Sequence, residues 1–138
     1  MRRRLLGLVA GVVFATAATA SAHHAVQAQF DVTQGSTELK GTLQKAEWIN
    51  PHAKLHVLVK NPTTGQDESW EIQMAGTTTL RRLGFPLSAR GGAQAGDPIT
   101  VTVFKARNGS TTGLLRSITF ADGKTFNRGV YGEEDLAK

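Results

Sequence analysis

Segments with the alternation or composition of β-strands fill most of the chain, and only one short helical pattern interrupts them. The strand-like segments are residues 38–49, 53–60, 69–74, 99–103 and 114–120. Residues 78–83 form the helical pattern, with Thr77 as the expected N-cap and with Gly84 and Pro86 as stop signals. A chain with this order must bury its apolar strand faces against one another, because so short a helix cannot cover them.

Three strands, a helix and two strands are the element order of the five-stranded barrel called the OB-fold. We therefore predict an all-β fold with one short helix, a small five-stranded OB-fold-like barrel. An immunoglobulin-like sandwich is the rival architecture, but it requires about seven strands. Alternation places Leu55, Val57 and Val59 in the core and the neighbouring side chains of that strand outside. Gly41 is expected to mark a bend or bulge in the first strand.

The first 22 residues have the features of a secretory signal peptide. Three arginines precede an apolar stretch, and Ala20-Ser21-Ala22 is a small-residue cleavage site. This signature favours removal over a stable membrane anchor. Because the chain has no cysteine, disulfides, thiolate metal sites and a lipoprotein anchor are excluded. We expect a periplasmic protein that is secreted through its signal peptide.

Four segments follow from these patterns. Residues 1–22 are the expected signal peptide, residues 23–36 an N-terminal arm, residues 37–128 the OB-like barrel domain, and residues 129–138 a flexible C-terminal tail. Phe30 is the residue expected to pin the arm to the barrel. Removal of the signal leaves 116 residues and lowers the formal net charge from +5 to +2. So mild a charge indicates neither a nucleic-acid partner nor a membrane partner.

A cut after Ala22 makes His23 the amino terminus of the mature chain. Its α-amine and imidazole then form a chelate on one residue, and both groups lose their protons readily near neutral pH. With His24 and His52 they provide three to four nitrogen ligands, a set that suits Cu(II) best and Ni(II) or Zn(II) less well. Asp31 is a candidate oxygen ligand or hydrogen-bond acceptor for an imidazole. The arrangement resembles the histidine brace of periplasmic copper proteins.

A second cleavage site, Ala18-Thr19-Ala20, leaves His23 in third position. A third-position histidine binds Cu(II) or Ni(II) through the amine, two backbone amides and the imidazole. Both cleavage positions therefore favour copper, with different ligands. The opposing interpretation is a solvated terminus with incidental metal affinity, because chain termini are usually poorly ordered.

Several motifs together resemble a family of small exported bacterial proteins known only as a domain of unknown function. They include His23-His24, Phe30-Asp31 and above all Trp48-Ile49-Asn50-Pro51-His52, and the likeness extends roughly from His23 to Phe126. The resemblance implies periplasmic export and a small β-rich domain, with no established activity. His23, His24 and His52 match the family pattern, whereas His56 stands where members more often have an aromatic residue.

The leading hypothesis is a periplasmic copper-binding protein that uses His23, His24 and His52 and exchanges metal with a periplasmic protein partner. The alternative is a binding module without metal that uses the barrel face, where Lys54, His56 and Glu71 point outward, or the loop of residues 88–96. No catalytic motif stands out, so the sequence does not favour an enzyme, although the ligand set would permit an oxidative copper enzyme. Nucleic acid is a poor candidate partner in the periplasm.

Overall fold

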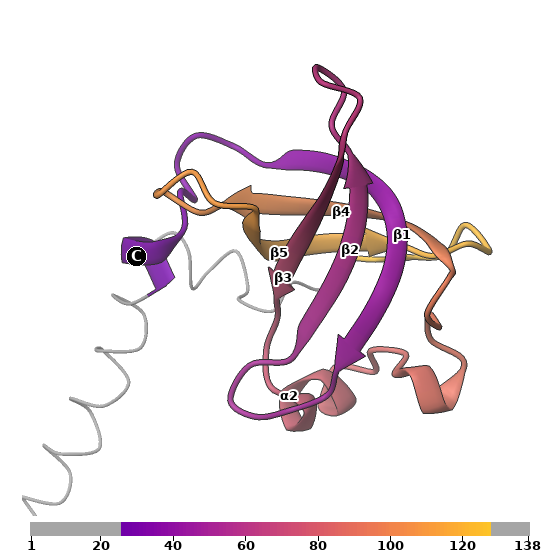
Figure 1. Cartoon of the computed structure of the whole chain (residues 1–138). Coiled ribbons are helices and arrows are strands. Elements are labelled where there is room, and N and C mark those ends of the chain that lie inside the picture. Colours follow the sequence, from indigo (N-terminus) through magenta and orange to yellow (C-terminus); the bar gives the residue numbers. More distant parts are fainter. Residues whose placement is uncertain (1–25, 128–138) are drawn as a thin grey trace, which may run out of the picture.

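Five strands close into a barrel in the computed structural model, which describes residues 26–127 (Figure 1). The strands are β1 Thr37–Glu47, β2 Lys54–Lys60, β3 Asp67–Gln73, β4 Pro98–Lys105 and β5 Thr112–Thr119. They lie in the order β3-β2-β1-β4-β5, and a parallel pairing of β3 with β5 closes the barrel. A short sixth strand, β6 Thr125–Phe126, pairs with β5. The predicted mostly-β, five-stranded OB-fold-like barrel is confirmed.

The inward faces of the strands form the main hydrophobic core. Side chains from every barrel strand belong to it, among them Leu43, Val57, Ile72, Val101 and Ile118, each at most 1% exposed. The alternation predicted for β2 is confirmed, because its odd-numbered residues from Leu55 to Val59 are buried and its even-numbered residues are more exposed. This inside–outside alternation leaves the outer wall of the barrel to polar side chains.

Two short helices lie between β3 and β4, at one end of the barrel (Figure 1). They are the α-helix α2 Thr77–Arg82 and the 3-10 helix η1 Ser88–Arg90. The expected N-cap was wrong by one residue: Gly76 is the N-cap, and Thr77 is the first helical residue. The hydroxyl of Thr77 donates to the carbonyl of Ile49 instead of capping its own helix. Gly84 ends this segment with a positive φ of 77°.

The irregularity of β1 lies beyond the predicted position. The pairing with β2 shifts between Leu43 and Lys45, so the bulge is at Gln44 and the expectation of a bulge at Gly41 was wrong. Gly41 meets a different requirement, because a Cβ there would collide with the carbonyl oxygen of Leu58. The glycine therefore permits the close approach of β1 to β2.

The N-terminal arm is fastened to the outside of the barrel. Residues 26–29 form a helical turn, and Phe30 is fully buried and bridges to Ala106. Val26 and Phe30 belong to a second apolar cluster with Phe104, Ala106 and Leu114, separate from the main core. The expected role of Phe30 as the pin of the arm is thus confirmed. The predicted signal peptide, His23, His24 and residues 129–138 lie outside the described residues. Within residues 26–127, no helix is long and apolar enough to cross a membrane.

Truncation of Phe30 tests how much the arm contributes to stability. We expect Phe30→Ala to lower the free energy of unfolding by about 3–5 kcal/mol, because a fully buried aromatic side chain is lost. Ile49 is 47% exposed, so Ile49→Ala is the control and should change stability by no more than about 0.5 kcal/mol. Equal denaturant midpoints for the two variants would show that the arm does not stabilise the barrel.

Candidate metal centre and outer barrel face

His52 lies half-buried in the loop between β1 and β2. On one side of this loop Trp48 packs against Phe85, with ring centroids 6.0 Å apart. On the other side the Ala53 N–H donates to the Ala75 carbonyl at 3.1 Å. The loop that carries His52 is therefore attached to the body of the protein before and after the histidine.

The described part of the chain supplies only one of the three predicted ligands. Within residues 26–127, no group of three His, Asp or Glu side chains is placed to hold a metal ion. His23 and His24 lie outside the described residues, so the structure does not test whether they meet His52. A metal site of the predicted kind must take its remaining ligands from the amino-terminal residues.

The register of the strands relates the attachment of the arm to the start of β2. Leu114, which belongs to the apolar cluster beneath the arm, pairs with Gln73 across the barrel closure, and Gln73 pairs with Lys54. Neighbouring strands lie about 4.8 Å apart, so two pairings separate Leu114 from Lys54 by roughly 10 Å. The register thus places Leu114, one residue of this cluster, two strands from the start of β2, whereas the arm itself bridges to Ala106 after β4.

Asp31 is held by its neighbours on the arm. Its carboxylate accepts hydrogen bonds from the hydroxyl of Thr33 at 2.8 Å and from the Thr33 N–H at 3.2 Å, and it lies 3.6 Å from the Arg107 guanidinium. The Thr33 hydroxyl bond is the main cause that lowers the pKa of Asp31 below its ordinary value. This carboxylate therefore fits a fixed acceptor in the arm better than a free metal ligand.

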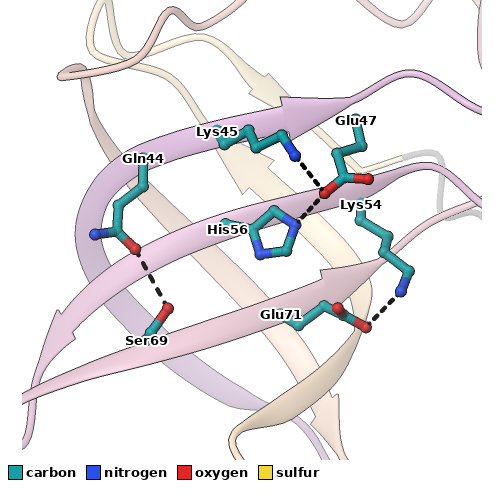
Figure 2. A network of polar contacts seen from close by, with 7 residues as sticks. All are labelled: Gln44, Lys45, Glu47, Lys54, His56, Ser69 and Glu71. Carbon is teal, nitrogen blue, oxygen red and sulfur yellow. Dashed lines mark hydrogen bonds and ion pairs between the residues drawn. The ribbon is translucent and has the colours of Figure 1, made fainter.

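His56 belongs to a polar network on the outer face of the barrel, which also contains Lys45, Glu47, Lys54 and Glu71 (Figure 2). Its Nε2 lies 2.8 Å from Glu47 Oε1, and the Lys45 ammonium lies 2.9 Å from the same oxygen. Beside them Lys54 and Glu71 form an ion pair at 2.9 Å. The hydrogen bonds of Glu47 with Lys45, which is the larger cause, and with His56 lower the pKa of the Glu47 carboxyl.

Of this network, the sequence predicted that Lys54, His56 and Glu71 face outward, but it did not identify Glu47 as the partner of His56. The two residues are nine apart and meet because Lys45 pairs with His56 across the bulged part of β1. The position of the bulge decides this pairing, and no local signal gave that position. The charges of the face are largely matched within the face itself.

A groove of about 580 Å³ lies between the segment that begins at η1 and the β5–β6 hairpin. Phe120 and Phe126 contribute apolar surface to it, and its charged lining residues are Arg90, Asp97, Asp122 and Lys124, of which Lys124 pairs with Asp122 at 3.1 Å. Gly91, Gly92 and Ala93 of the predicted binding loop line its other side. The loop of residues 88–96 therefore borders a real depression of the surface.

Removal of the Lys45 ammonium tests the outer network. We expect Lys45→Met to raise the pKa of Glu47 toward its ordinary value, as followed by an NMR titration of its carboxyl carbon. Because the folded-state pKa is lowered, the network stabilises the fold above the unfolded pKa of Glu47, and this contribution disappears as the pH falls through the folded pKa. Lys40→Met, which removes an exposed pair with Glu38, is the control. Identical Glu47 titrations in all three proteins would contradict the assignment.

Comparisons with known proteins concern the family and the architecture. No curated protein sequence matches the chain. Among solved structures, the chain is similar to the mitochondrial single-stranded DNA binding protein Rim1 of S. cerevisiae, with a TM-score of 0.45 and 12% identity over 62% of this chain and 92% of that one. A family model matches residues 11–117, which are most of the sequence. The chain belongs to the Family of unknown function (DUF6152).

Proposed function

We propose that the mature chain is a periplasmic Cu(II)-binding protein in which His23, His24 and His52 supply nitrogen ligands. The proposal includes export and a cut after Ala22, which frees the α-amine of His23. Amine and imidazole nitrogens without thiolates favour Cu(II) over Ni(II) and Zn(II) by ligand type and by the Irving–Williams order. Cu(II) held in this way is available for exchange with a periplasmic protein partner.

The observation that carries the proposal is that the arm, which directly follows the terminal histidines, is fastened to the barrel by Phe30 and its apolar cluster. Val26 lies in the apolar cluster with Leu114, and Leu114 is about two strand spacings from Lys54. From Lys54 back to His52 is a further two residues, or roughly 7 Å. The three residue steps from Val26 back to His23 can span roughly 10 Å. A site shared by the arm and the loop therefore requires residues 23–25 to run from this cluster toward the loop between β1 and β2.

His56 is kept out of this ligand set for a physical reason. Its Nε2 already has a carboxylate partner at 2.8 Å, and the ammonium groups of Lys45 and Lys54 lie in the same network. The neighbouring carboxylates of Glu47 and Glu71 are paired with these two lysines, so the groups around His56 are already engaged with one another. The same arrangement makes His56 a suitable control for the ligand variants.

The alternative cut after Ala20 predicts a different site. His23 would then stand in third position and bind Cu(II) with the amine and two backbone amides, without His52. Intact mass of the exported protein decides between a start at His23 and a start at Ser21. The Cu(II) affinity of His52 variants distinguishes the two sites independently, because only the shared site requires this histidine.

Competition with a chromogenic chelator tests the proposal. We expect the mature protein to bind one Cu(II), and His23→Ala or His52→Ala to weaken its affinity tenfold or more, because each removes a nitrogen ligand. His56→Ala should retain the wild-type affinity. Equal affinity of the wild type, the His23 variant and the His52 variant would contradict the proposal. Loss of affinity in the His23 variant alone would assign the metal to the terminus without the barrel.

A second candidate is a binding module that works without metal. The groove beside η1 favours this function, since it combines aromatic surface from Phe120 and Phe126 with charged side chains of both signs. Such a module would hold a protein, an envelope glycan or a small molecule. A ligand that co-purifies with the protein and is retained in the presence of a metal chelator would support this function over copper binding.

A further inference from the structure

We infer that Asn50, Gly76 and Thr77 are positioning residues that hold the backbone of His52 in place for its ligand. This inference rests on the proposed function, because it assigns a fixed backbone position to one of the proposed copper ligands. Asn50 precedes His52 by two residues, whereas Gly76 and Thr77 lie at the start of α2, more than twenty residues further along the chain. The contact between these two segments carries the inference.

Two carbonyl-type oxygens of the loop receive hydrogen bonds from the start of α2. The backbone carbonyl of Ile49 accepts from the Thr77 N–H at 3.1 Å and from the Thr77 hydroxyl at 3.2 Å. The side-chain oxygen of Asn50 accepts from the Thr78 N–H at 3.3 Å. The first N–H groups of a helix have no partner within the helix, so the loop satisfies donors that α2 leaves open.

Gly76 allows the loop to lie directly on the helix. A Cβ at this position would collide with the side-chain oxygen of Asn50 and would lie 2.7 Å from the carbonyl oxygen of Pro51. Gly76 has a φ of −63°, which other residues adopt without strain. Its requirement is therefore space, and the space is filled by the two residues that precede His52.

The residue after His52 is held by the same part of the chain. The Ala53 N–H donates to the Ala75 carbonyl at 3.1 Å, and the Met74 N–H donates to the Ala53 carbonyl at 2.8 Å. Residues 74–78 thus hold the backbone on both sides of His52. A ligand whose backbone is already fixed loses less conformational freedom when a metal binds, which raises affinity.

Among the residues that hold the His52 loop, Thr77 makes the most specific contact. It is 6% exposed and is the one polar residue buried in the described part of the chain. Burial of a hydroxyl is costly unless the hydroxyl is hydrogen-bonded, and here it is bonded to the loop and not to its own helix. The carbonyl of Ile49 keeps the Thr77 N–H as a donor when the hydroxyl is removed. Substitution of this hydroxyl therefore weakens the contact between α2 and the His52 loop without leaving a buried acceptor unpaired.

The variant Thr77→Val tests the inference. Thr77→Ser is the conservative rescue, and Thr79→Val is the matched control on the same helix. The readouts are Cu(II) affinity, the EPR parameters of bound Cu(II), and hydrogen exchange of the Thr77 and Ala53 amides in the metal-free protein. We expect Thr77→Val to exchange these amides roughly two- to tenfold faster, since one hydrogen bond is lost. Its Cu(II) affinity should fall by a similar factor with altered EPR parameters, while the other two variants behave as the wild type.

The variant Asn50→Leu is a second test of the inference, and it leaves the core unchanged because Asn50 is exposed. It removes the acceptor for the Thr78 N–H and should shift affinity and EPR parameters in the same direction. If the wild type binds Cu(II) but Thr77→Val and Asn50→Leu only lower the Tm, the positioning role is wrong and the proposed function stands. If the wild type binds no Cu(II), the proposed function is wrong, and the inference falls with it.

Discussion

The parallel pairing of β3 with β5 closes the barrel, and the positions of the arm and of the His52 loop both depend on it. Only residues 71–73 of β3 and 112–114 of β5 take part in this pairing. Gly113, in the middle of this stretch of β5, also allows β4 to come close, because a Cβ there would lie 2.8–3.2 Å from side-chain atoms of Val103. The Glu71 N–H also donates to the Thr111 carbonyl at 3.0 Å, which extends the pairing by one bond. A short contact between distant segments thus converts a curved sheet into a closed barrel.

Closure has a consequence for the outside of the barrel as well as for its core. It places the start of β5 beside the end of β3 and one further strand from the start of β2. Leu114, which belongs to the apolar cluster beneath the arm, therefore lies two strands from the start of β2. Residues 74–78 continue from the same β3 and hold the His52 loop. The strand β3 thus both pairs with the start of β5 and leads into the segment that holds the His52 loop.

Local patterns predicted the parts of the fold that depend on local physics. Alternation identified the five barrel strands and the buried faces of β2 and β3, and glycine and proline marked the end of α2. The pattern missed the bulge at Gln44, the role of Thr77 and the pairing of His56 with Glu47, because each depends on a partner far away in sequence. The same limit applies to the proposed metal site: position and chemistry make the histidines candidate ligands, but no local pattern specifies whether His23 and His52 come together.

The most direct test of the account is paramagnetic broadening of backbone amide signals by substoichiometric Cu(II) in the mature protein. A metal bound jointly by the terminal histidines and His52 broadens two groups of signals at once, those of residues 26–29 and those of the loop around His52. This simultaneous broadening is the predicted result. Broadening of the arm signals alone, with the loop signals unchanged at the same copper ratio, would contradict a site shared between the terminus and the barrel.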